Sequence, residues 1–208
     1  MSGRSKSSDR WLREHFSDPF VQRAKSEGWR SRAIYKLEEI DKKEKLLKPG
    51  FVCLDLGAAP GAWIQYARRQ VGRPGRLIAT DILAMPAIPA VEFVQGDFRD
   101  SAVFEALLAL CPERGVDVLL SDMSPNMSGV DVIDHPRSAH LVELALELAA
   151  RVLKPGGCAL IKVFQGAGFE ELVRTARVQF GKVKLIKPQA SRTRSPELYL
   201  LAKAFVMV

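Results

Sequence analysis

The segment from residue 54 to residue 63, which reads Leu-Asp-Leu-Gly-Ala-Ala-Pro-Gly-Ala-Trp, constrains the fold of this chain more than any other segment. An apolar run over residues 51–56 ends at Gly57, and a helical pattern starts again at Trp63. This pattern predicts a buried strand, a tight loop and the first turn of a helix. Proteins of the α/β class use that arrangement to hold nucleotide-like ligands at a helix N-terminus.

The residues of this loop exclude the two commonest nucleotide loops. A dinucleotide fingerprint needs glycine where Ala59 and Ala62 stand, and a phosphate loop ends in Gly-Lys-Ser/Thr, a triplet that this chain lacks. Pro60 has no N–H group to offer a phosphate. The loop therefore favours a ligand with little negative charge, such as S-adenosylmethionine. An ordinary strand–helix turn is the alternative.

Acidic residues end the next two apolar runs. Asp81 ends the run over residues 76–81, and Asp97 ends the run over residues 91–97. An acid about 20 residues after a glycine loop can bind ribose hydroxyls, in NAD sites as well as in S-adenosylmethionine sites. We expect the strands that end near Asp55, Asp81 and Asp97 to line one crevice at the carboxyl edge of a parallel sheet.

The rest of the chain alternates between strand and helix patterns, which predicts a parallel sheet covered on both faces. Residues 1–8 are predicted to form a disordered basic tail. Residues 9–208 are predicted to form one domain with a helical extension over about residues 9–47, in which Ser31 caps a helix that runs to Lys45. Further strands are expected over residues 116–122, 158–163, 182–186 and 198–206, and further helices over 139–152 and 169–180.

Positive charge is concentrated at the two ends of the chain. Residues 1–48 contain 13 Lys/Arg and 8 Asp/Glu, and residues 182–208 contain 6 and 1, whereas the whole chain has a net charge of +7. This asymmetry favours a polyanionic partner, nucleic acid first, with plain solubility as the alternative. The candidate phosphate contacts are Arg23, Arg30, Arg32, Arg192 and Arg194.

Other features bear on the compartment and on metals. The chain has no apolar run of membrane-spanning length and no signal-peptide core after Met1. Cys53, Cys111 and Cys158 form neither zinc-ligand pairs nor an even disulfide set. We therefore expect a cytoplasmic protein without a metal and without a membrane contact, and we expect it to be a monomer.

A candidate catalytic pair lies on the fourth and fifth predicted strands. Asp122 ends the fourth strand, and Lys162 lies inside the apolar run of the fifth. A lysine in an apolar strand is costly unless it is paired or functional. Adjacent strands would bring Lys162 and Asp122 together. Glu197 begins the last predicted strand, after the basic segment over residues 191–196.

Several segments together resemble a known family. They are Lys36, residues 54–63, Asp-Met-Ser-Pro-Asn-Met-Ser-Gly over 122–129, Lys-Val-Phe-Gln-Gly over 162–166, and Ser-Arg-x-x-Ser-x-Glu-x-Tyr over 191–199. Through these segments, which are spread over nearly the whole chain, it resembles the FtsJ family of S-adenosylmethionine-dependent ribosomal RNA 2′-O-ribose methyltransferases. Bacterial members usually have Gly-Gly-Trp where this chain has Gly61-Ala62-Trp63. The departure adds one methyl group and keeps Gly61.

The resemblance implies a fold, a site and a substrate. The fold is the Rossmann-like class I methyltransferase fold of the α/β class, a seven-stranded, mostly parallel sheet with an antiparallel last strand and helices on both faces. The substrate is a uridine in the aminoacyl-tRNA-site loop of 23S ribosomal RNA, methylated in the assembled 50S subunit. The implied catalytic set is Lys36, Asp122, Lys162 and Glu197, and the implied cofactor contacts are Gly61, Trp63, Asp81, Asp97 and Asp122.

The sequence leaves two questions open. Lys162 is our candidate for the proton acceptor, but it could instead orient the hydroxyl and stabilise developing negative charge. The substrate could be transfer RNA or another RNA. A base-nitrogen methyltransferase is disfavoured because Met-Ser-Pro-Asn stands where such enzymes carry Pro-Pro-aromatic. A non-catalytic RNA-binding factor for ribosome assembly and a nicotinamide dehydrogenase are the alternatives from other classes.

Overall fold

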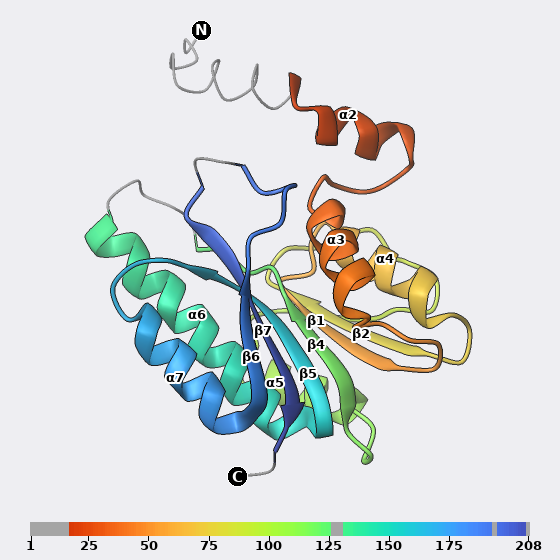
Figure 1. The fold of residues 1–208 in the computed structure, drawn as a ribbon. Coiled ribbons are helices and arrows are strands. Elements are labelled where there is room, and N and C mark those ends of the chain that lie inside the picture. Colours follow the sequence, from red (N-terminus) through yellow and green to blue (C-terminus); the bar gives the residue numbers. More distant parts are fainter. Residues whose placement is uncertain (1–16, 126–130, 193–194, 207–208) are drawn as a thin grey trace, which may run out of the picture.

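The computed structural model of this protein describes residues 17–125, 131–192 and 195–206. The predicted tail over residues 1–8 lies outside these ranges. Figure 1 shows a central twisted sheet with helices packed against it on both sides. The strands are β1 (Val52–Leu56), β2 (Arg76–Asp81), β3 (Glu92–Gln95), β4 (Val116–Ser121), β5 (Leu153–Phe164), β6 (Phe180–Ile186) and β7 (Glu197–Phe205). The helices are α2 (Pro19–Ser26), α3 (Ile34–Glu44), α4 (Ala62–Val71), α5 (Ser101–Leu110), α6 (Asp131–Val152) and α7 (Phe169–Gln179).

The strands form one seven-stranded sheet in the order β3-β2-β1-β4-β5-β7-β6. Strands β1 to β5 pair in parallel, and β7 is antiparallel to both of its neighbours, β5 and β6. The predicted sheet with an antiparallel last strand is therefore confirmed. Strand β1 lies in the middle of the sheet and is wholly buried, which is why the run over residues 51–56 is apolar except for Asp55.

The two faces of the sheet carry separate apolar cores. On one face, Leu54 and Leu56 of β1 belong to the core that holds α5, α6 and α7. On the other face, Cys53 of β1 belongs to the core that holds α3 and α4. In Figure 1, α3 and α4 lie to the right of the sheet and α6 and α7 to its left. Because strands β1 to β5 run parallel, their carboxyl ends lie at the same edge of the sheet.

The structure differs from the predicted elements at several places, and it adds α5, a helix for which the sequence analysis gave no range. Helix α6 begins at Asp131, earlier than predicted, and accommodates Pro136 within it. Strand β5 begins at Leu153, before the predicted start at residue 158, and so includes the Pro-Gly-Gly segment over residues 155–157. Ser31 does not cap α3, because that helix begins at Ile34 and the Ser31 hydroxyl accepts a hydrogen bond from the Ala33 N–H in a local turn.

Glu44, the last residue of α3, connects this helix to the two antiparallel strands. Its carboxylate accepts hydrogen bonds from Lys184 Nζ at 2.7 Å and from Lys203 Nζ at 2.8 Å. Lys203 also donates to the backbone carbonyl of Glu44, where a cation complements the helix dipole. The hydrogen bonds from Lys184 and Lys203 lower the pKa of Glu44 to about 2. The helix that carries Lys36 is thus anchored at its far end to β6 and β7.

We expect the Glu44→Gln variant to be less stable than the wild type at pH 7. The pKa of Glu44 is depressed in the folded protein, so its contribution is present above the ordinary value of 4.5 and is lost as pH falls towards about 2. The difference in urea midpoint between the two proteins should therefore shrink between pH 7 and pH 3. Glu105→Gln, at an exposed position of α5, serves as the control. A difference that stays constant with pH would contradict this interpretation.

Candidate active site

The register of β4 and β5 brings the first candidate pair together. Ser121 pairs with Ile161, so the residues that follow them, Asp122 and Lys162, are neighbours at the carboxyl edge of the sheet. Lys162 Nζ lies 3.2 Å from Asp122 Oδ1 and donates to the Asp122 backbone carbonyl at 2.6 Å. The Lys162 side chain is only 8% exposed. Burying the charge of Lys162 would cost free energy without a partner, and Asp122 is that partner.

The second pair lies beside the first. Lys36, in the first turn of α3, forms an ion pair with Glu197, the first residue of β7, at 2.8 Å. Both side chains are largely buried, at 13% and 11% exposed. Four separate elements, α3, β4, β5 and β7, thus bring the four predicted catalytic residues to one place.

Tyr199 joins the two pairs, a contact that the sequence analysis did not identify. Its hydroxyl donates to Asp122 Oδ1 at 2.6 Å, and Lys36 Nζ lies 5.8 Å from the centre of its ring. Burial, followed by the charges of Asp122 and Glu197, raises the pKa of Tyr199 well above its ordinary value, so the hydroxyl keeps its proton. The available signal was the two-residue spacing from Glu197, because alternate residues of a strand face the same side.

Both carboxylates of the cluster are held in their charged form. Burial by itself would raise the pKa of Asp122, but the charges of Lys162 and Lys36 and the hydrogen bond from Tyr199 lower it below its ordinary value. Burial likewise opposes ionisation of Glu197, and the charge of Lys36 and its hydrogen bond lower the pKa of this carboxyl. The cluster therefore places two ionised carboxylates beside Lys36 and Lys162.

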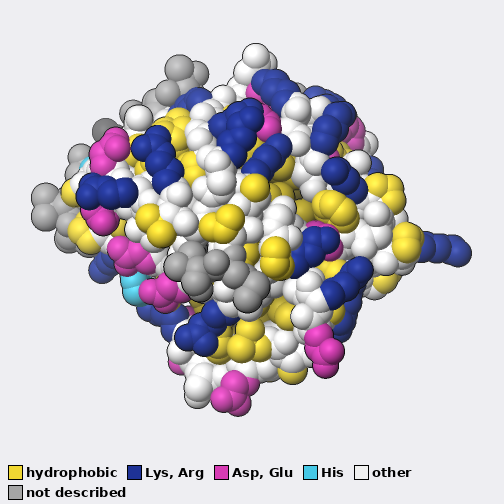
Figure 2. Space-filling model, turned by 60° about the horizontal axis from the view of Figure 1, so that its bottom comes forward, with side chains coloured by type: hydrophobic (Ala, Val, Ile, Leu, Met, Phe, Trp, Pro, Cys, Tyr) yellow, Lys and Arg dark blue, Asp and Glu magenta, His cyan; other side chains and the backbone are white. Residues whose placement is uncertain are grey.

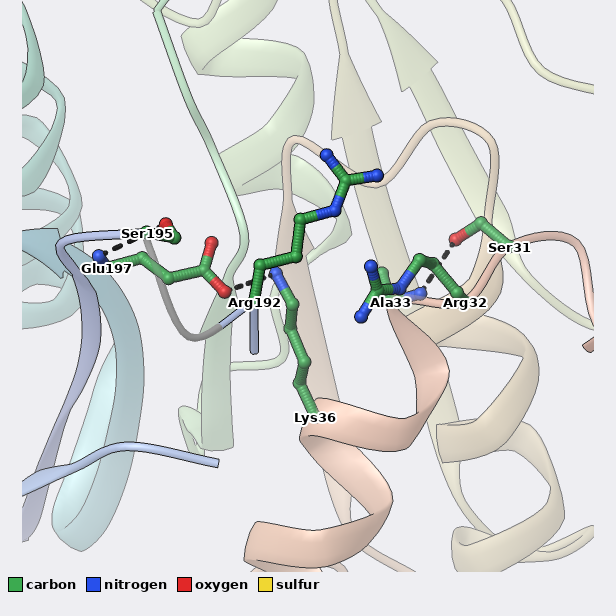
Figure 3. Close-up of a pocket in the computed structure, with 7 residues that line it drawn as sticks. All are labelled: Ser31, Arg32, Ala33, Lys36, Arg192, Ser195 and Glu197. Carbon is green, nitrogen blue, oxygen red and sulfur yellow. Dashed lines mark hydrogen bonds and ion pairs between the residues drawn. The ribbon is translucent and has the colours of Figure 1, made fainter. Parts of the chain in front are cut away.

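A cavity of about 500 Å³ opens over the Lys36–Glu197 pair. Figure 3 shows Lys36 and Glu197 in contact with each other at the cavity wall, with the Arg192 guanidinium extending away from the pair. Arg32, on the far wall, is bound to the Asp18 carboxylate and the Ala190 carbonyl. The lining residues are Ser31, Arg32, Ala33, Lys36, Arg192, Ser195 and Glu197.

The three acids expected at the carboxyl edge, Asp55, Asp81 and Asp97, lie at or near the ends of three adjacent strands but differ in environment. Asp81 accepts from the Ala59 N–H and the Leu83 N–H, both at 2.8 Å. Asp97 is bound by Arg99, and the hydrogen bond from Arg99 lowers its pKa. Asp55 is 1% exposed, and neither of its oxygens has a hydrogen-bond partner in the described part of the chain. Burial first, then the charges of Asp122 and Asp81, raises the pKa of Asp55 well above its ordinary value.

The two other predicted cofactor contacts, Gly61 and Trp63, lie at the beginning of α4. Gly61 has a φ of +103°, and a Cβ atom there would lie 2.9 Å from Arg30 Nη1, so only glycine suits the position. The Trp63 side chain is 3% exposed; its indole N–H donates to the Ala33 carbonyl at 2.8 Å and its ring packs on Tyr199. Trp63 therefore has a packing role that the sequence analysis did not predict, and its contact with a cofactor stays a prediction.

A family model described as FtsJ-like methyltransferase matches residues 29–205. The chain belongs to the FtsJ-like methyltransferase family. The resemblance inferred from the motifs is confirmed, and a dehydrogenase is set aside. The matched range includes all four residues of the Lys36, Asp122, Lys162 and Glu197 cluster.

Relatives match the chain over almost its whole length. The protein named ribosomal RNA large subunit methyltransferase E in Legionella pneumophila (strain Corby) is 58% identical over 202 residues, which cover 97% of this chain and 98% of that protein. The protein of the same name in Stenotrophomonas maltophilia (strain K279a) is 56% identical over 203 residues, covering 98% and 97%.

Solved structures agree with this assignment. A Plasmodium falciparum protein described as a ribosomal RNA methyltransferase has a TM-score of 0.76 at 30% identity, covering 85% of this chain and 98% of that chain. Fibrillarin of Aeropyrum pernix, solved with natively bound S-adenosyl-L-methionine, has a TM-score of 0.54 at 18% identity, covering 83% and 74%. The second likeness concerns the fold alone. The protein therefore has the class I methyltransferase fold.

The described part of this FtsJ-like protein has neither a metal-site cluster nor a membrane-spanning helix. Within the described ranges, no group of three or more His, Cys, Asp or Glu side chains has the arrangement of a metal site. None of the described helices is both long enough and apolar enough to span a membrane.

The structure revises the set of candidate phosphate contacts. Arg23 pairs with Glu27 at 2.7 Å, and Arg32 is bound to Asp18 and Ala190. Arg30 is also engaged internally, by backbone carbonyls. Arg30 and Arg32 are occupied because they hold segments of the protein together, whereas Arg23 is 51% exposed in its pair with Glu27 and stays a candidate. Arg192 lines the cavity and remains a candidate, and Arg194 lies outside the described residues.

Proposed function

We propose that this protein methylates the ribose 2′-oxygen of a uridine in the aminoacyl-tRNA-site loop of 23S ribosomal RNA, in the assembled 50S subunit, with S-adenosylmethionine as the methyl donor. The observation that carries the proposal is the pair of interlocked ion pairs, Lys36–Glu197 and Lys162–Asp122, beside the cavity. The name printed for the relatives, a ribosomal RNA large subunit methyltransferase, supports the choice of RNA.

The residues around the glycine loop fit S-adenosylmethionine. At Gly57 a Cβ atom would lie 2.6 Å from Met123 Cγ. The loop can therefore lie this close to the segment after β4 only because residue 57 has no side chain. The acids Asp81 and Asp97 can accept from hydroxyl or amino groups, because each carboxylate oxygen has a second lone pair. Asp55, whose buried oxygens are among those without a hydrogen-bond partner in the described residues, lies two residues before Gly57. We infer that Gly61, Trp63, Asp81, Asp97 and Asp122 hold this group, which when bound supplies an activated methyl.

Lys162 is the proton acceptor in this proposal. The ribose 2′-hydroxyl is a weak nucleophile, so its O–H bond has to break as its oxygen attacks. The proton passes to Lys162 Nζ, which must first have lost one of its own. Asp122 orients Lys162 through the 3.2 Å ion pair and the 2.6 Å hydrogen bond to its carbonyl. Lys36 and Glu197, which face the cavity, position the ribose.

The cavity and the surrounding charge suit an RNA substrate. Its volume of about 500 Å³ lies in the range of small-ligand pockets, and the Ser31 and Ser195 side chains and the Arg192 guanidinium at its wall can donate to phosphate oxygens. Figure 2 shows Lys and Arg side chains spread widely over the face at the bottom of Figure 1 as well. The net charge of +7 suits a large polyanion such as a ribosomal subunit.

The decisive experiment offers labelled S-adenosylmethionine to the protein with isolated 50S subunits, naked 23S ribosomal RNA or transfer RNA, and then analyses the product nucleosides. We expect 2′-O-methyluridine, formed only with the 50S subunit. Label in transfer RNA would move the assignment to the alternative substrate. A methylated base would overturn it, and binding without transfer would favour a non-catalytic assembly factor.

A further inference from the structure

Arg30 is bound to three backbone carbonyl groups from two different segments of the chain. Its Nη1 donates to the Pro60 carbonyl at 3.1 Å and to the Pro86 carbonyl at 2.6 Å, and its Nη2 donates to the Ala87 carbonyl at 3.0 Å. Pro60 belongs to the glycine loop between β1 and α4, and Pro86 and Ala87 follow β2. One side chain therefore connects two segments that are separate in sequence.

The same two segments also meet at Asp81. Its Oδ2 accepts from the Ala59 N–H in the glycine loop, and its Oδ1 accepts from the Leu83 N–H after β2. Asp81 thus holds the two segments through their N–H groups, and Arg30 holds them through their carbonyl groups. The segments fixed in this way are those that border the predicted ribose contact, Asp81.

Arg30 is itself held in place from the other side. Its backbone N–H donates to Gln65 Oε1 at 3.2 Å, and Gln65 Nε2 donates to the Gly28 carbonyl at 3.0 Å. Gln65 lies in α4, the helix that begins at the glycine loop. The absence of a side chain at Gly61 is what leaves room for the Arg30 guanidinium. The arginine is therefore fixed against the helix whose first turn it helps to shape.

We propose that Arg30 is a positioning residue for the methyl-donor site and is not an RNA contact. It holds the glycine loop and the segment after β2 in the conformation that receives S-adenosylmethionine, so that binding does not have to order them. This inference rests on the proposed function, because it presupposes that cofactor. Lysine cannot replace Arg30, since a single ammonium does not reproduce the planar fork that reaches carbonyls on two segments.

The test measures cofactor affinity and RNA affinity separately in the full-length protein. Isothermal titration with S-adenosylmethionine is done on the wild type, on Arg30→Ala and on Arg30→Lys, the second of which retains the charge. We expect the Kd for the cofactor to rise about tenfold or more in both variants, with KM for the cofactor raised and kcat near the wild-type value at saturation. The affinity for 50S subunits and its dependence on salt should not change.

Arg69→Ala is the matched control, because Arg69 is an exposed arginine of α4 that stacks on Trp29 at 3.9 Å and is not bound to the glycine loop. It should bind the cofactor within about twofold of the wild type. Unchanged cofactor affinity in Arg30→Lys, with weaker RNA binding and a salt slope reduced by about one, would overturn the inference and make Arg30 a phosphate contact. Failure of the wild type itself to bind the cofactor would instead overturn the proposed function, before any variant is compared.

Discussion

Replacing Lys162 with arginine is expected to lower the rate of methyl transfer as severely as replacing it with alanine, by about 10²–10⁴-fold. Arginine keeps a positive charge and can donate hydrogen bonds to Asp122, but it stays protonated at any working pH and so cannot accept the 2′-hydroxyl proton. The Lys162 side chain is 8% exposed and fixed by two contacts with Asp122, so no other lysine of the cluster can take its place without rearrangement.

The measurement is a single-turnover assay with 50S subunits at saturating S-adenosylmethionine, together with cofactor titration, which should give near wild-type affinity for both variants. Lys182→Arg, an exposed position of β6, is the control and should keep full activity. If Lys162→Arg retained a tenth or more of the wild-type rate while Lys162→Ala did not, the lysine would act through its charge. It would then orient the hydroxyl and stabilise developing negative charge, the alternative that the sequence left open.

The sheet could be predicted because its signals are local. The apolar run of β1, interrupted only by Asp55, follows from burial on both faces of the sheet. The acids at the ends of the next two strands mark the carboxyl edge of the parallel part of the sheet. The errors lie where tertiary contacts override local preference. Pro136 is a helix breaker by itself, yet it lies inside α6, and the Pro-Gly-Gly segment forms part of β5.

The site was predictable only in part, for a similar reason. Lys162 could be identified because a lysine in an apolar strand needs a partner. The expected adjacency of the fourth and fifth strands then indicated that this partner is Asp122. Lys36 and Glu197 depended on the family resemblance, since a helix charge and a strand-end charge are usually solvated. The internal bonds of Arg30 and Arg32 could not be predicted, because an arginine that binds backbone carbonyls looks in the sequence like one that binds phosphate.

The Asp122→Asn variant should be less stable than the wild type by about 3–5 kcal/mol, in addition to losing methyl transfer. Asparagine keeps the shape of the side chain and can still accept the hydrogen bond from Tyr199, but it removes the charge that balances Lys162. With Lys162 only 8% exposed, water cannot replace the lost partner. Urea unfolding at neutral pH measures the loss. There Asp122 is ionised in the wild type, because Lys162 and Lys36 lower its pKa against the effect of burial.

Asp117→Asn provides a matched control at the opposite end of β4. Asp117 is also buried; it pairs with Lys154 and accepts from the Val52 N–H at 2.8 Å, a bond that asparagine can keep. The Lys154 side chain is 39% exposed, so water can solvate its charge, and the expected cost is about 1 kcal/mol or less with methyl transfer retained. Equal destabilisation by the two substitutions would contradict the view that Asp122 matters through the buried charge of Lys162. If Asp122→Asn kept its activity, the carboxylate would not be needed to orient that lysine.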